Sequence, residues 1–144
     1  MEQLQLAINK VLADTFVMYF KAHSNHWNVT GPDFSQYHDF FGKLYEELWG
    51  AVDTIAEHVR AIDGIALSSL DLVKQMATVS ESNNPASAME MFNDMLMANN
   101  LVLVSLMRAY QLADDADELG LANFLQDRID IHQKHGWMLK ATLK

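Results

Sequence analysis

The sequence contains no cysteine and only two prolines and six glycines among its 144 residues. Without cysteine the chain can form neither a disulfide nor a thiolate metal site. Few prolines and glycines favour long uninterrupted elements, and no apolar run approaches the roughly 20 residues that a membrane-spanning helix needs. The first residues also lack the basic segment and apolar segment of a signal peptide. We therefore expect one cytoplasmic domain over residues 1–144, with no membrane partner.

Positive charge is also scarce, because 10 Lys and Arg stand against 19 Asp and Glu, giving a net charge of −9. Affinity for nucleic acid rests chiefly on Lys and Arg contacts to phosphates. The first ten residues carry one Lys, and the last residues form no basic tail. We therefore expect no DNA binding, whereas an acidic surface is suited to gathering cations.

What the sequence does have is apolar residues at spacings of three and four, which predict four long amphipathic helices. In chain order they cover about residues 3–29, residues 34–62, about residues 85–119, and the remainder to Leu143. Thr30-Gly31-Pro32 ends the first helix, because glycine and proline disfavour its continuation. Asp63-Gly64 is expected to cap the second helix and Gly120 the third.

A longer connection, residues 65–84, separates the second helix from the third, and Leu70, Leu72 and Val73 predict a short helix within it. A connection of this length lets the third helix return alongside the second. Four long helices with one long crossover are typical of a ferritin-like bundle. The predicted fold class is therefore all-α.

Four candidate metal ligands lie in the first two predicted helices: His26, His38, Asp53 and Glu57. The turn at Pro32 lies midway between the histidines, so antiparallel helices bring them together. Asp53, however, stands roughly 22 Å from His38 along one helix, at about 1.5 Å per residue. The carboxylates can join the histidines only from a second copy that lies antiparallel alongside. The sequence therefore predicts metal sites shared between twofold-related subunits.

The same residues carry a family resemblance. HWNV, a following glycine, Phe34, His38 four residues later, Tyr45 seven further on, and the DxxAE segment from Asp53 to Glu57 resemble the Dps family of mini-ferritins. The resemblance covers nearly the whole chain, including its closing HQKHGWMLK. It implies a hollow dodecamer in which His26, His38, Asp53 and Glu57 are ferroxidase ligands across the twofold axis. The implied activity is oxidation of Fe(II), with hydrogen peroxide as the favoured oxidant, then storage of ferric mineral, which protects against oxidative damage.

One departure from that family's pattern affects the ligand set. Gly42 stands where the family usually has a carboxylate, four residues after the second histidine. His58 and Gln133 also replace residues common in the family, an Arg and a Glu. His26, with Asp53 and Glu57 from the partner, is then expected to form the stronger iron position, and His38 with bridging Glu57 a weaker one completed by water. The alternative is a cage whose impaired centre mainly sequesters cations, with zinc as a competitor for the same ligands.

Simpler interpretations of the same residues stay open. Asp53 and Glu57 alone could form a solvated face balanced by Arg60. His26 could merely bind free carbonyl groups or interact favourably with the dipole at a helix end. His132 is interpreted as a hydrogen-bonded core histidine, with a secondary ligand role for His132 or His135 as the minority view. Two groups of acidic residues could each be simply a solvated surface. The first could instead line the pores that admit iron: Asp114, Asp115, Asp117, Glu118, Asp127 and Asp130. The second could instead face the cavity and seed mineral: Asp39, Glu46 and Glu47. The methionines Met89, Met91, Met95 and Met97 are interpreted as packing and surface residues, since iron prefers nitrogen and oxygen ligands.

Overall fold

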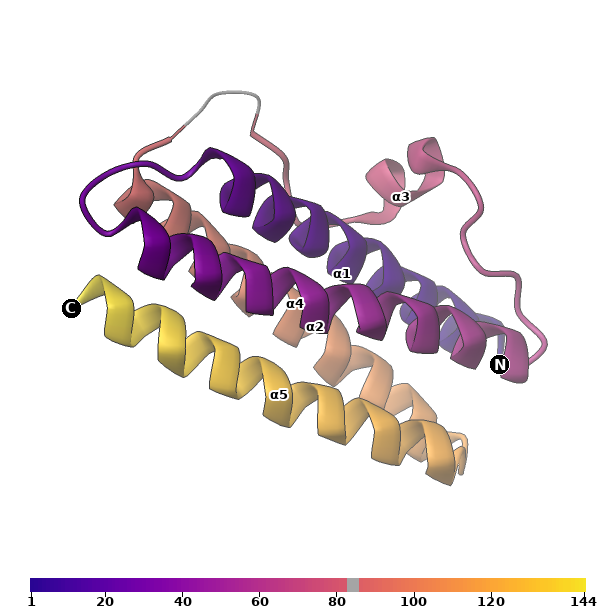
Figure 1. The fold of residues 1–144 in the computed structure, drawn as a ribbon. Helices are drawn as coiled ribbons and strands as arrows, with labels where there is room; N and C mark the ends of the chain where they lie inside the picture. The colour runs from indigo at the N-terminus through magenta and orange to yellow at the C-terminus, as the bar shows by residue number, and fades with distance from the viewer. Residues whose placement is uncertain (83–85) are drawn as a thin grey trace.

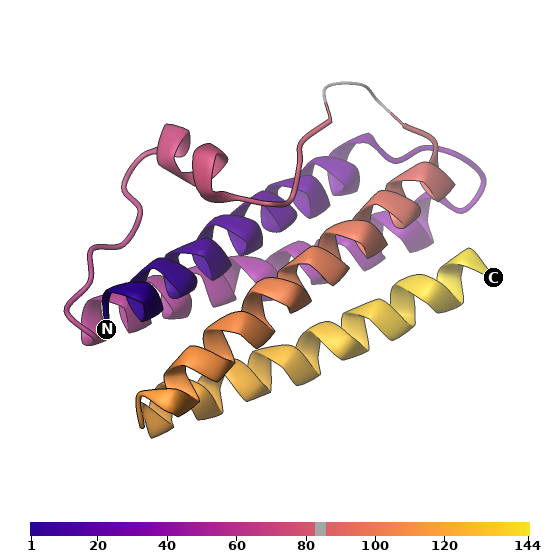
Figure 2. The same ribbon diagram turned by 180° about the vertical axis from the view of Figure 1, so that it is seen from behind.

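A computed structural model describes residues 1–82 and 86–144, and within these ranges every regular element is a helix. Four long helices lie side by side, and the crossover carries a short fifth helix along the outer side of the bundle (Figures 1 and 2). The elements in chain order are α1 (Glu2–Asn28), α2 (Phe34–Ala61), α3 (Leu70–Met76), α4 (Ala88–Asp115) and α5 (Leu119–Leu143). The predicted all-α bundle with a helix-bearing crossover is confirmed.

The ends of α1 and α2 follow from local backbone chemistry. Gly31, in the turn between the two helices, has φ +120°, a conformation that residues with a side chain rarely adopt. At the end of α2 the Gly64 N–H donates to the Val59 carbonyl at 3.0 Å. The left-handed residue of this cap is Asp63, with φ 63°. The predicted Asp63-Gly64 cap is therefore confirmed, with the aspartate in the position that glycine usually takes.

The predicted end of the third helix is wrong by four residues. α4 ends at Asp115 and α5 begins at Leu119, so Gly120 lies in the first turn of α5 rather than after α4. The helix ends earlier because Asp117 adopts φ 57° and the Glu118 N–H closes the cap on the Ala113 carbonyl at 3.0 Å. A short polar side chain tolerates this left-handed conformation. The predicted start near Pro85 lies outside the described residues.

The apolar faces of the four long helices meet in one hydrophobic core. α1 packs against α2, α4 packs against α5, and α1 also meets α4. Phe41 of α2 and Phe92 of α4 are fully buried and stack with ring centroids 4.6 Å apart. Met91 and Met95 are buried while Met89 and Met97 are exposed, as expected for packing and surface residues. The core thus fixes how α2 is rotated, and hence which residues α2 turns away from the bundle.

The crossover is held to α1 by buried polar side chains. Asp14, with no exposed surface, accepts hydrogen bonds from the backbone N–H groups of Thr78 and Val79. It also accepts a bond from the Ser105 hydroxyl of α4. Burying an unpaired carboxylate would be very unfavourable, so these donors are required wherever Asp14 is buried. One side chain therefore joins α1, the crossover and α4.

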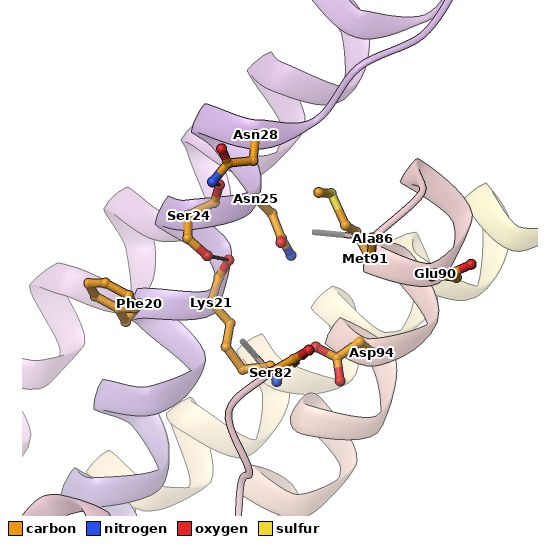
Figure 3. Close-up of a pocket in the computed structure, with 10 residues that line it drawn as sticks. All are labelled: Phe20, Lys21, Ser24, Asn25, Asn28, Ser82, Ala86, Glu90, Met91 and Asp94. Carbon is orange, nitrogen blue, oxygen red and sulfur yellow. Dashed lines mark hydrogen bonds and ion pairs between the residues drawn. The ribbon is translucent and has the colours of Figure 1, made fainter. Parts of the chain in front are cut away.

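Lys21, about two turns further along α1, makes a similar connection (Figure 3). Its ammonium lies 2.8 Å from the Asp94 carboxylate and donates to the Ser80 carbonyl at 2.6 Å. The two side chains line a pocket of about 420 Å³ between α1 and α4. Because the lysine and the aspartate neutralise each other, the remaining charged side chain that lines this pocket is the Glu90 carboxylate.

Candidate metal centre

The turn between α1 and α2 places His26 and His38 against each other. Their rings stack with centroids 3.7 Å apart and an interplanar angle of 19°. His26 Nδ1 bonds to the His38 carbonyl at 2.7 Å, and His38 Nδ1 bonds to the His26 carbonyl at 2.6 Å. The antiparallel hairpin therefore produces a reciprocal pair: each ring is oriented by the backbone of the other residue.

These two hydrogen bonds also decide which nitrogen of each ring is free. A carbonyl oxygen can only accept, so each Nδ1 carries the proton and donates it. In the neutral ring, Nε2 then holds a lone pair. Metal-binding histidines typically have this arrangement, with one ring nitrogen bonded to a carbonyl and the other facing the metal. The pair is thus oriented as two metal ligands would be before any ion arrives.

A third histidine, His23, lies beside the pair and was missed by the sequence reasoning. Its ring stacks on Tyr45 with centroids 3.8 Å apart and an interplanar angle of 5°. A 2.9 Å hydrogen bond joins its Nδ1 to the Tyr19 hydroxyl. Burial, and then the neighbouring His26, lower the pKa of His23. The available signal was its position: His23 lies three residues before His26, on the same side of α1.

Asp53 and Glu57 lie on the exposed surface of α2, four residues apart. The hydrogen bond and the charge of Asp53 raise the pKa of Glu57. Arg60 does not balance them: its guanidinium donates to the Gly64 carbonyl at 2.6 Å. Among the ion pairs of the described residues, none includes either carboxylate. Within the described residues no ion pair therefore joins Arg60 to Glu57, although both carboxylates lie on an exposed face, as the solvated-face interpretation expects.

The histidine pair and the carboxylate pair do not meet within one chain. Over residues 1–82 and 86–144, no three His, Asp or Glu side chains of this chain come together in a way that could hold a metal ion. About 22 Å of helix separates His38 from Asp53. One chain therefore presents its two pairs of candidate ligands at separate places.

Aromatic side chains surround the histidine pair and extend to the surface. Trp27 and Trp49 are each 56 % exposed. Trp27 packs on His23 with centroids 4.3 Å apart, and Trp49 packs on Tyr19 at 4.9 Å. Exposed tryptophans of this size next to polar ligands are typical of a surface that another molecule covers.

A second polar cluster, between α2 and α5, answers the questions about Glu47, His132 and His135. The Arg128 guanidinium forms two hydrogen bonds with Glu47, and the His135 ring bonds to the same carboxylate at 2.7 Å. His132 is fully buried, with one ring nitrogen 2.8 Å from the Asn99 amide oxygen and the other 3.0 Å from Arg128. Both of its ring nitrogens are thus occupied, as expected for a core histidine. Glu47 is likewise held by partners rather than free to bind mineral.

Comparison with known proteins identifies the family to which this chain belongs. The ferritin-like domain family matches residues 5–144. The DNA protection during starvation protein of Brevibacillus brevis is 36 % identical over 138 residues, which span 95 % of this chain and 92 % of that protein. The chain belongs to the Dps family. General stress protein 20U of Bacillus subtilis (strain 168) is 34 % identical over 145 residues, covering 99 % and 98 % of the two chains.

Solved structures agree with this membership. The crystal structure of a Dps protein from Bacillus brevis superposes with a TM-score of 0.95 and 34 % identity, covering 99 % of this chain and 96 % of that one. Dps membership and the ferritin-like domain support a mini-ferritin role. None of the described helices combines the length and apolar character that crossing a membrane would require.

Proposed function

We propose that this Dps protein binds and oxidises Fe(II) at centres shared between twofold-related subunits, and stores the ferric product in a dodecameric cage. The observation that supports this proposal is that one chain carries two incomplete sets of candidate ligands, His26 with His38 and Asp53 with Glu57. His26 and His38 are oriented with Nε2 available, and no third ligand from the same chain joins them within the described residues. A second subunit, antiparallel along α2, brings Asp53 and Glu57 to them, and the reverse contact forms the second centre.

The donor set suits ferrous iron and its oxidation product. Imidazole nitrogen binds Fe(II), and the harder carboxylate oxygens favour Fe(III). With hydrogen peroxide as oxidant, two Fe(II) ions give one electron each; the O–O bond breaks, and two protons are taken up to form two waters. This two-electron reduction consumes iron and peroxide together, so neither remains to generate hydroxyl radical. Protection from oxidative damage follows.

The surface charge is consistent with attracting iron. Asp114, Asp115 and Asp117 are exposed around the turn between α4 and α5, and Glu118 is partly buried beside them. With a net charge of −9, the surface attracts divalent cations. We assign these acids to the pores that admit iron, whereas Glu47 is excluded from mineral seeding by its bonds to Arg128 and His135.

The test is iron-dependent consumption of peroxide by the assembled protein. Wild type should consume about one peroxide for every two Fe(II) added, and the double variant Asp53→Asn/Glu57→Gln should lose most of the rate. Glu46→Gln, an exposed acid of the same helix, is the matched control and should retain the wild-type rate. Peroxide loss in the double variant at the wild-type rate would overturn the assignment of these carboxylates.

The second candidate is a cage that mainly sequesters cations, and Gly42 favours it because this position supplies no ligand. The two functions differ in rate and in competition. A working ferroxidase oxidises the first ions added rapidly and is inhibited when zinc occupies the same ligands. A sequestering cage binds zinc and iron alike, and its oxidation of iron stays close to the rate in buffer. Initial rates with and without Zn²⁺ separate the two.

A further inference from the structure

Gly42 lies directly against the ring of His26. A Cβ placed on Gly42 would be 3.1 Å from His26 Nδ1 and 3.2 Å from His26 Cε1. Carbon atoms in favourable contact stay about 3.5–4.0 Å from their neighbours. The position that lacks a carboxylate is thus filled by an imidazole, and any side chain there meets the ring.

The His26 ring has little freedom to move away. It stacks on His38 at 3.7 Å and bonds through Nδ1 to the His38 carbonyl at 2.7 Å. The atom that a new Cβ would approach most closely is this same Nδ1. A shift of a few tenths of an ångström therefore changes both the hydrogen bond and the direction of Nε2, and ligand geometry must be held within about 0.5 Å.

We propose that Gly42 is a positioning residue in this chain: its missing Cβ allows the His26 ring to lie this close to α2 while it stacks on His38 and keeps Nε2 free. In this view a side chain at position 42 of this chain shifts the imidazole, so a carboxylate there does not simply add one ligand to an otherwise unchanged centre. The centre of this chain is then built around the imidazole pair. The identity of the metal rests on the proposed function; the position of the ring does not.

A second glycine of the same helix provides the comparison. Gly50 also lies inside α2, and a Cβ added there meets nothing within 4 Å. Glycine is among the least favourable residues in a helix interior, so alanine at either position should stabilise the helix. Only at Gly42 should the methyl group also disturb a ligand. Stability and metal affinity therefore separate the structural effect from the positioning effect.

The experiment compares Gly42→Ala, Gly42→Asp and Gly50→Ala with wild type in the assembled protein. Calorimetric titration with Zn²⁺ measures affinity, absorption of bound Co²⁺ reports the ligand geometry, and thermal melting of the metal-free protein reports stability. We expect Gly50→Ala to raise the melting temperature by about 2–4 °C and to leave both metal readouts unchanged. Gly42→Ala should raise the melting temperature by less, because its methyl group displaces the His26 ring, and should weaken Zn²⁺ binding roughly fivefold, with an altered Co²⁺ spectrum.

Gly42→Asp distinguishes positioning from a merely missing ligand. If Gly42 only lacks a carboxylate, Gly42→Ala binds Zn²⁺ like wild type and Gly42→Asp binds more tightly or takes a second ion; that result would overturn the proposal. If Gly42 positions His26, both variants bind the first ion more weakly. Should wild type bind neither metal, the proposed function fails, and crystal structures of metal-free wild type and Gly42→Ala still decide whether the ring moves. An unmoved ring would overturn the positioning role.

Discussion

Two clusters of histidine and carboxylate, one on each side of α2, differ in whether they are complete. Between α2 and α5, Glu47 meets Arg128 and His135, and Arg128 reaches His132. On the other side, the hairpin orients His26 and His38, while Asp53 and Glu57 lie on an exposed face about 22 Å further along α2. Among the described residues, neither carboxylate takes part in an ion pair. The first cluster finds its partners inside one chain. The second has donors and acceptors left over.

The difference teaches how a single chain can indicate an assembly. Buried polar groups are nearly always paired, because an unpaired one is costly. A closed cluster therefore stabilises the fold that encloses it, and its histidines have no free lone pair. The oriented histidines lie beside exposed tryptophans and lack further ligands from the described part of their own chain, and we propose that a second subunit supplies them. Mutations should accordingly act on stability at one cluster and on metal binding at the other.

Disrupting the closed cluster, which consists of Glu47, Arg128, His132 and His135, should have the largest effect on stability. Glu47→Gln leaves the buried Arg128 guanidinium without its counter-ion, and loss of one partner of a buried pair costs about 3–5 kcal/mol. We expect the free energy of unfolding to fall by about 3 kcal/mol in denaturant titrations at fixed protein concentration. Glu46→Gln, one residue away and exposed, should change it by less than about 0.5 kcal/mol. A loss below about 1 kcal/mol for Glu47→Gln would show that the ion pair contributes little.

Acid should weaken the same cluster in two stages. Burial lowers the pKa of His132 well below its ordinary value of 6.5, so protons bind the unfolded chain preferentially and stability falls as pH drops below about 6.5. Bonds to His135 and Arg128 outweigh the effect of burial and lower the pKa of Glu47 to about 2 from 4.5. Its contribution is present above about pH 4.5 and is lost as pH falls toward 2.

Unfolding measured in denaturant at pH 7.5, 5.5 and 4 checks this pH dependence. Wild type should lose stability at each step, and Glu47→Gln should lose less than wild type between pH 5.5 and pH 4, because its own carboxylate no longer titrates. Equal stability at pH 7.5 and 5.5 would contradict the assignment of a neutral, buried His132.

The fold was predictable because its signals are local and repeated. Apolar spacing over some 25 residues locates each long helix, and the turn at Gly31 has a backbone that glycine alone adopts readily. The end of α4 was not predictable in the same way. Asp117 takes a left-handed conformation that an aspartate tolerates but does not require, while Gly120 three residues later is the more usual capping residue. The general preference for glycine at this position therefore indicated the wrong residue.

The contact between His26 and His38 was predictable from the sequence, whereas the contacts that other residues make around them were not. Spacing along α1 and α2 selected His26 and His38, because an antiparallel hairpin leaves no other place for them. The contact of Gly42 with the His26 ring depends on how the two helices are rotated, which is set by the whole core. Likewise, nothing local to Glu47 indicates Arg128, 81 residues away. Patterns within one helix could be recognised from the sequence, whereas these other contacts between helices could not.

Mutation of Asp53, one of the exposed carboxylates of α2, should change the free energy of unfolding in the opposite direction and by the smallest amount. Asp53 and Glu57 are like charges four residues apart, a spacing that destabilises a helix by about 0.2–0.5 kcal/mol. Asp53→Asn removes this repulsion and should raise the free energy of unfolding of the metal-free protein slightly, by no more than that amount. Zn²⁺ binding should weaken at least tenfold in the same variant, since a ligand oxygen loses its charge. A clear loss of stability without metal would mean that Asp53 already has a structural partner, and the contrast between the two clusters would not hold.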